Sequence, residues 1–70
     1  MNYLVVIEAG ETAVGAYVPD LPGCIAVANT EEEALRLVQE AMALHIEKLR
    51  SQGLPVPKPR SRAELVLADS

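Results

Sequence analysis

The stretch that most constrains this fold is residues 18–24, with the sequence VPDLPGC. Pro19 and Pro22 each fix their own φ and remove a backbone hydrogen-bond donor, and each disfavours helix at the residue before it. Gly23 can take a positive φ without steric cost, and Asp20 can bond to the nearby backbone as in an Asx-turn. The stretch therefore predicts a rigid corner between two strands. Its simplest interpretation is a structural turn, and such a corner can also carry recognition residues.

Three short apolar runs, rich in β-branched residues, surround this corner. Residues 2–8 and 13–18 precede or lead into it, and residues 24–28 follow it. The short connection at residues 9–12, punctuated by Gly10, predicts that the first two strands pair antiparallel. Apolar residues of both parities in the first run predict a strand that is covered on both faces, or a central strand of the sheet.

Residues 31–52 give the clearest helical signal in the chain. Thr30 and Glu33 have the spacing of a capping box, and three glutamates in the first turn complement the positive end of the helix dipole. Apolar residues recur at helical spacing, at Ala34, Leu35, Val38, Ala41, Met42, His45, Ile46 and Leu49. Leu37 and Leu44 widen this face beyond what one sheet covers, which favours a helix that also meets a partner chain.

The residues after the helix predict an extended strap. Gly53 suits the position just past a helix end, and alternating prolines at residues 55–59 favour a polyproline-like path back across the domain. Residues 61–64 repeat the capping-box spacing, whereas residues 64–68 are mostly aliphatic. The pattern fits either a short fourth strand or a helical turn at residues 64–68, and it does not separate the two.

Size and composition indicate how the fold is stabilised. Seventy residues predict a single domain over residues 1–70, and a domain this small is only marginally stable alone. Cys24 is the only cysteine and His45 the only histidine, so neither a disulfide nor the usual zinc site of four nitrogen and sulfur ligands can reinforce it. Oligomerisation is the remaining way to stabilise so small a domain, so we expect a homodimer or a larger homo-oligomer.

Charge and hydropathy narrow the classes of partner and compartment. The net charge of −4 argues against direct binding of nucleic acid and is compatible with a basic protein partner. No apolar run approaches the length of a membrane span, and the first residues lack a basic signal region. With a lone thiol as well, we expect a cytoplasmic protein that does not associate with membranes.

The sequence lacks the patterns of catalytic sites. Cys24 lies in an apolar run without a neighbouring base, which predicts an inert buried thiol, and His45 fits a core or interface position on the helix. Glu8 and Asp20 are two scattered acids and do not form a two-metal nuclease pattern. There is no glycine-rich phosphate loop and no nucleophile elbow. We therefore expect no enzymatic activity, no cofactor and no metal.

Taken together, three stretches resemble the HicB family of antitoxins. They are the corner with Tyr17 before it, the helix start TEEEAL at residues 30–35, and the strap GLPVPKP at residues 53–59. The resemblance covers nearly the whole chain. It implies an α+β fold of the ββ β-α-β kind: a three-stranded antiparallel sheet packed by one long helix, as in a partial ribonuclease-H-like domain without the nuclease's catalytic acids.

The resemblance also implies a partner. Antitoxins of this family bind and neutralise a HicA toxin, a small basic mRNA-cleaving ribonuclease with a double-stranded-RNA-binding-like fold. Many members carry a further helix-turn-helix or ribbon-helix-helix segment that binds operator DNA. This chain stops before such a segment, so autorepression is not carried over to it. Ala28 and Asn29 stand where the family tends to have a glycine and an acidic residue, so we expect the local geometry before the helix to differ.

We predict that the corner presents the partner-binding surface. This surface would comprise Tyr17, Pro19, Asp20, Leu21, Pro22 and Gly23. Asp20 is the residue expected to meet a basic residue of the toxin. The alternative, from another functional class, is an orphan homo-oligomeric scaffold or small-ligand-binding module without a toxin. A residual nuclease that uses Glu8 or Asp20 is a third hypothesis.

Overall fold

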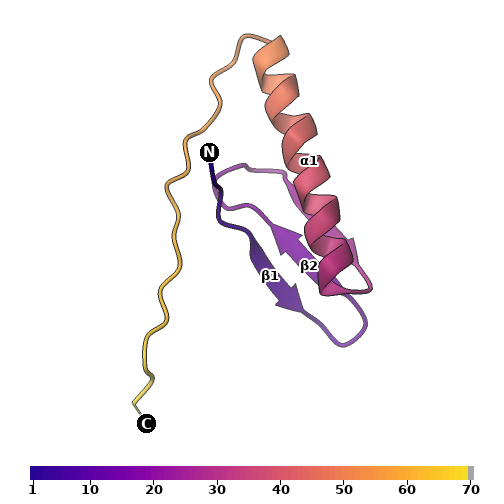
Figure 1. Cartoon of the computed structure of the whole chain (residues 1–70), viewed down its shortest axis with the longest axis vertical. Helices are drawn as coiled ribbons and strands as arrows, with labels where there is room; N and C mark the ends of the chain where they lie inside the picture. The colour runs from indigo at the N-terminus through magenta and orange to yellow at the C-terminus, as the bar shows by residue number, and fades with distance from the viewer. Residues whose placement is uncertain (70) are drawn as a thin grey trace.

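The protein folds into a three-stranded antiparallel sheet with one long helix packed across one of its faces (Figure 1). The structure is a computed structural model and describes residues 1–69. The elements within these residues are β1 (Val6–Ala9), β2 (Val14–Tyr17), β3 (Ile25–Ala28) and α1 (Glu31–Ser51), and the strand order is β1-β2-β3. This arrangement confirms the predicted α+β fold.

The strands are shorter than the apolar runs that predict them. β1 begins at Val6 and not at residue 2, because its first residue pairs with Tyr17, the last residue of β2. Beyond Tyr17 the chain turns into the corner, where the amide of Val18 donates to the carbonyl of Cys24 on the β3 side. Residues 2–5 therefore have no strand to pair with on this side.

The two faces of the sheet differ in what covers them. Ala16 and Ala28 are buried on the face that packs against α1, where Ala34 and Val38 meet them. These small side chains let the helix approach the sheet closely. The opposite face is open, and it displays Tyr17 together with the large apolar residues of β3.

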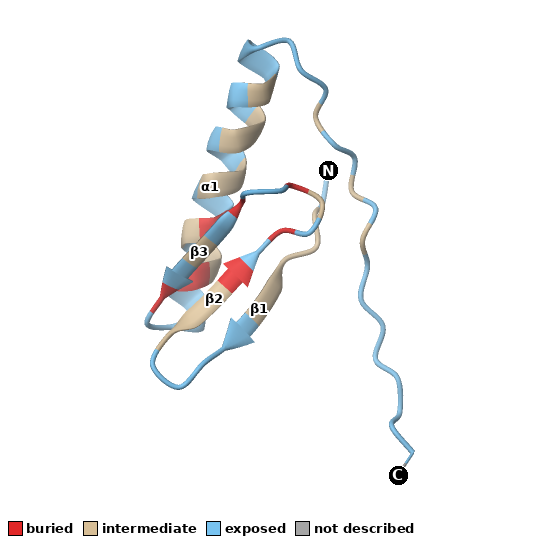
Figure 2. Ribbon diagram, turned by 180° about the vertical axis from the view of Figure 1, so that it is seen from behind, coloured by how far each residue is buried: buried red, intermediate tan, exposed pale blue. Residues whose placement is uncertain are grey.

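β1 lies at the rim of the domain, because α1 packs mainly over β2 and β3 (Figure 2). Val6 and Ile7 are half-buried, and Glu8 and Ala9 are exposed. The expectation of a first strand covered on both faces is therefore wrong for the single chain. Within residues 1–69 no further strand extends the sheet beyond the edge at β1.

Both ends of α1 show the predicted signals. The side chain of Thr30 accepts a hydrogen bond from the amide of Glu33 at 3.1 Å, which satisfies one of the free donors of the first turn. At the other end Gly53 has a φ of 69°. The amide of Leu54 donates to the carbonyl of Leu49 at 2.9 Å. This is a Schellman motif, and it ends the helix at Ser51.

The core is small and aliphatic. Its two largest fully buried side chains are Leu21, from the corner, and Val38, from α1. No polar or charged residue is buried among residues 1–69. Burial of a Leu or Val side chain stabilises a fold by about 1.5–3 kcal/mol. The corner thus contributes to the core as well as to the surface.

After the helix the chain returns along the β1 side of the domain as an extended strap of residues 54–61 (Figure 1). Residues 62–69 continue in the same direction beyond it, without regular secondary structure. Residues 64–68 are therefore neither a fourth strand nor a helical turn in the single chain. Their three large aliphatic side chains are exposed.

Candidate partner-binding site

The corner of residues 18–24 is closed by a set of short backbone hydrogen bonds. The amide of Val18 donates to the carbonyl of Cys24, that of Leu21 to Val18, and that of Cys24 to Leu21, each at 3.1 Å. Gly23 has a φ of 91°, a conformation that residues with a side chain rarely adopt. These bonds and the two prolines give the corner one defined conformation.

The corner has an apolar inner side and a proline-rich outer side. Val18, Leu21 and Cys24 are all buried and pack into the core. Pro19 and Pro22 are exposed, with Gly23 beside them. Among the residues predicted to bind a partner, Leu21 has its side chain buried in the core, beneath the exposed residues of the corner. The exposed prolines are the ones placed to touch another molecule.

Asp20 holds the strap. One of its carboxylate oxygens accepts hydrogen bonds from the backbone amides of Arg60 and Ser61, both at 2.8 Å. The other oxygen accepts from the hydroxyl of Ser61 at 2.9 Å. The contact predicted between Asp20 and a basic residue of the toxin stays a prediction; within this chain the Asp20 carboxylate is bonded to two backbone amides and one hydroxyl, and the guanidinium of Arg60 makes none of these bonds.

These contacts stabilise the ionised form of Asp20. The amides of Ser61 and Arg60 hold the pKa of its carboxyl below the ordinary value of 3.8, and the positive charge of Arg60 adds a smaller effect in the same direction. Asp20 is therefore negatively charged at neutral pH. A second anchor lies nearby along the strap, where the hydroxyl of Tyr3 donates to the carbonyl of Pro57.

Tyr17 connects the corner to the open face of the sheet. It pairs in register with Ile25 of β3, so both side chains lie on the face away from α1. Val27, two residues further along β3, lies on the same face, and all three are exposed. Tyr17 and the exposed prolines therefore belong to a surface that continues from the corner onto an apolar strand.

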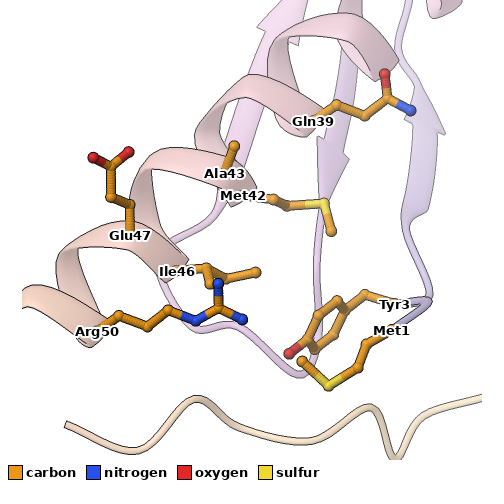
Figure 3. Close-up of a pocket in the computed structure, with 8 residues that line it drawn as sticks. All are labelled: Met1, Tyr3, Gln39, Met42, Ala43, Ile46, Glu47 and Arg50. Atoms are coloured by element: carbon orange, nitrogen blue, oxygen red, sulfur yellow. The ribbon is translucent and has the colours of Figure 1, made fainter. Parts of the chain in front are cut away.

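A shallow groove of about 580 Å³ lies between α1 and the N-terminal residues. Met1 and Tyr3 lie opposite Met42 and Ile46, and Arg50 reaches across from the end of the helix (Figure 3). The groove is mainly apolar and contains no residue of the corner. Sequence reasoning did not identify it, because it depends on how far α1 extends past the sheet.

Among residues 1–69, the reactive side chains Cys24 and His45 lie apart from any metal-binding cluster. Burial raises the pKa of the Cys24 thiol, which favours the unreactive protonated form. His45 is half-buried on α1, as a core or interface position predicts. Across residues 1–69, no three side chains of His, Cys, Asp or Glu come together in a way that would hold a metal ion.

The helix is also unsuited to crossing a bilayer. In the part of the chain that the structure describes, no helix combines the length and the apolar character that a membrane span requires. This agrees with the charged residues that recur along α1.

The sequence matches, over residues 3–69, the family described as the HicB-like antitoxin of bacterial toxin-antitoxin systems. The chain belongs to this family. It is 40% identical over 58 residues to a UPF0150 protein of Synechocystis, covering 81% of this chain and 73% of that protein. It is 38% identical over 61 residues to a UPF0150 protein of Thermoplasma acidophilum, covering 83% and 86% of the two chains.

The fold of this HicB-like chain also matches a solved structure. One chain of a HicA3 and HicB3 toxin-antitoxin complex superimposes with a TM-score of 0.68 and is 33% identical in sequence. The match covers 84% of this chain and 70% of that chain. The architecture described above is therefore that of a protein found in such a complex.

The strap anchors are the part of this HicB-like site that sequence reasoning missed. The spacing of residues 61–64 suggested that Ser61 could cap a helical turn, whereas its hydroxyl bonds to Asp20. The remaining predicted residues lie together around the corner, with Tyr17, Pro19, Pro22 and Gly23 on the outside. Their role in binding a partner stays a prediction.

Proposed function

We propose that this protein is an antitoxin that binds a HicA-type mRNA-cleaving toxin and neutralises it by protein–protein contact. The observation that carries the proposal is the likeness, at 33% identity, to a chain of a HicA3 and HicB3 toxin-antitoxin complex. Membership of the HicB-like antitoxin family supports it independently of the structure. The toxin would be the ribonuclease of the pair, and this chain would have no catalytic step of its own.

The corner is the surface we assign to the toxin. Its outer residues Pro19, Pro22 and Gly23 are held in one conformation, so little conformational entropy is lost when they bind. Tyr17 adds an exposed aromatic side chain next to them, a residue type enriched at the energetic centres of interfaces. Asp20 acts beneath this surface by fixing the strap.

Charge supports the same pairing. The chain has a net charge of −4, and a ribonuclease that binds RNA must present positive charge to the phosphate backbone. Complementary charge accelerates the encounter of two such proteins and disfavours unrelated partners. Occupation of the toxin's basic surface by an acidic protein would exclude RNA. Because mRNA is the toxin's substrate, the pair would act in the cytoplasm.

We further propose that the antitoxin is a homo-oligomer. The single chain buries few large side chains and leaves the aliphatic residues of β3 and of residues 65–67 exposed. A chain of 70 residues is only marginally stable with a core of this size. Association of copies would cover apolar surface that folding of one chain leaves in water.

The test is to capture the tagged protein from lysate of its own cells and to identify bound proteins by mass spectrometry. A recovered HicA-type protein is then purified and assayed for RNA cleavage. We expect stoichiometric antitoxin to abolish cleavage. The double variant Tyr17→Ala/Pro22→Ala should restore it, whereas Gln39→Ala, an exposed change on the helix away from the corner, should not. Cleavage that is unaffected by excess antitoxin would overturn the proposal.

One observation favours a second candidate, the orphan small-ligand-binding module. The apolar groove beside Tyr3 and Met42 is large enough for a small molecule. Native mass spectrometry of protein purified from its own cells would show a bound small molecule that Met42→Trp, which fills the groove, displaces. If neither the unaltered protein nor Met42→Trp carries a bound small molecule, this candidate is ruled out.

A further inference from the structure

Residues 62–69, which we name the arm, contain the most exposed large aliphatic side chains of the described residues. Leu65, Val66 and Leu67 are 102%, 84% and 91% exposed. Three consecutive large aliphatic residues in extended conformation are an aggregation hazard if nothing covers them. Charged residues flank them, with Arg62 and Glu64 before and Asp69 after. The run is short and bounded, as expected for a strand with a specific partner.

The position of the arm is fixed where it leaves the domain. Its first residue follows Ser61 directly, and Ser61 is held by both carboxylate oxygens of Asp20. Tyr3 secures the strap a few residues earlier, at Pro57. Figures 1 and 2 both show the arm on the β1 side, running away from the helix and clear of the sheet. The arm is thus attached at one end and presented to solvent.

The sheet has a second unpaired edge, at β3. Ile25 and Val27 are 64% and 63% exposed on the open face of this strand. The opposite edge, at β1, ends in the exposed residues Glu8 and Ala9, so it offers less apolar surface. A strand added at β3 would pair with free backbone groups and meet aliphatic side chains on that face.

The helix side of the same edge is apolar as well. Met42 and Ile46 line the groove beside Tyr3, on the β1 flank of α1. At about 100° per residue, Leu37 and Leu44 lie on the opposite flank, toward β3. Leu44 is 68% exposed. The β3 edge is therefore bordered by exposed aliphatic side chains on both faces of the sheet.

The arm has the matching pattern. In an extended strand Leu65 and Leu67 face one side and Val66 faces the other. Paired with β3, the two leucines would lie beside Ile25 and Val27, and the valine would lie on the helix side of the sheet, as Ala26 does. The arm leaves its own domain beyond β1, across the whole sheet from β3. The β3 edge that receives it must therefore belong to another molecule.

We propose that the arm of one copy pairs as a fourth strand with β3 of a second copy, and that the exchange is reciprocal in a twofold dimer. The proposal specifies the contact that forms the homo-oligomer inferred above, and it rests on that inference but not on toxin binding. It also explains why residues 64–68 have no regular structure in one chain. Their strand partner is on the other molecule.

The first test is the mass of the purified protein in solution, measured by light scattering after size exclusion at tens of micromolar. We expect a dimer for the unaltered protein and a monomer for Leu65→Asp/Leu67→Asp. The matched control Leu54→Asp changes an exposed leucine outside the arm and should remain a dimer. The helical circular dichroism signal and the cooperative unfolding of all three should be retained, because the arm contributes no residue to α1 or to the core.

The outcomes test the arm exchange separately from homo-oligomerisation and from toxin inhibition. A dimer that persists in Leu65→Asp/Leu67→Asp would overturn the arm exchange and leave homo-oligomerisation standing. A monomer for the unaltered protein would overturn both. The RNA-cleavage assay is scored on Tyr17→Ala/Pro22→Ala, which leaves the arm intact. Failure of toxin inhibition is therefore distinguishable from failure of arm exchange.

The second test places the arm on β3. Two differently tagged copies carry Cys24→Ala, one with Val27→Cys and the other with Leu65→Cys or Leu67→Cys. Side chains that neighbour each other across paired strands lie within reach of a disulfide. We expect a covalent heterodimer on mild oxidation, and much less with Val66→Cys, which faces the other side. A heterodimer that forms with Glu8→Cys instead of Val27→Cys would overturn the assignment to β3.

Discussion

The carboxylate of Asp20 accepts hydrogen bonds from the backbone amides of Arg60 and Ser61, 40 and 41 residues further along the chain. One residue thus joins the corner to the strap. The corner's shape is set locally by its prolines and by Leu21 in the core. The path of residues 60–69 depends on this one side chain, because no secondary structure holds them.

Asp20→Ala should release the strap without unfolding the domain. The substitution removes three acceptor contacts to Arg60 and Ser61, and neither residue is part of the core. Limited trypsin digestion measures the effect, because cleavage after Arg60 and Arg62 requires a mobile backbone. We expect these cleavages to become at least several-fold faster. Glu8→Ala, which removes an exposed carboxylate elsewhere, serves as the control and should cleave like the unaltered protein.

Strap attachment should also depend on pH in a defined direction. The pKa of Asp20 is lowered in the folded protein, so its contribution is complete above the ordinary value of 3.8 and is lost as pH falls through the lowered value. NMR titration of the Asp20 carboxyl carbon should give a midpoint below 3.8. The amide shift of Ser61 should follow the same curve. A midpoint at or above 3.8 would contradict the hydrogen bonds described here.

The sequence was most informative where structure depends on neighbouring residues. The Thr30 cap, the αL residue Gly53 and the corner at Pro19–Pro22 are local, and each was predictable from side-chain chemistry alone. The Asp20–Ser61 contact joins distant residues and has no local signature. Val18 and Leu21, the aliphatic residues of the corner, pack into the core, a placement that depends on contacts across the fold.

The predicted binding surface combines residues that the structure exposes with one, Leu21, that it buries. Residue type placed Tyr17 and both prolines near one another, but only the packing distinguishes exposed Pro22 from buried Leu21. The pattern left residues 64–68 open between a strand and a helical turn, and in the single chain they form neither. Strand formation in such a segment depends on a partner edge, which lies outside its own sequence.

Leu21→Ala should destabilise the protein strongly. Leu21 is fully buried, and truncation of a buried leucine costs about 2–5 kcal/mol because apolar contacts are lost and a cavity remains. Urea denaturation at a fixed protein concentration measures the change in the free energy of unfolding. Pro22→Ala, the next residue along but exposed, should change it by about 1 kcal/mol or less. Equal effects of the two substitutions would contradict the inner and outer sides assigned to the corner.

Gly53→Ala should weaken the end of the helix and, with it, the start of the strap. Gly53 has a φ of 69°, and an L-residue with a Cβ pays about 1–2 kcal/mol to adopt this left-handed conformation. The space around it is open, so the cost comes from the backbone and not from a clash. The urea midpoint should fall accordingly, and Gly53→Asn, a residue that tolerates this conformation better, should recover part of the loss. Hydrogen exchange at Leu54, whose amide bonds to Leu49, should accelerate in the alanine variant. Unchanged exchange at that amide, together with an unchanged midpoint, would show that the Schellman motif is not what ends α1.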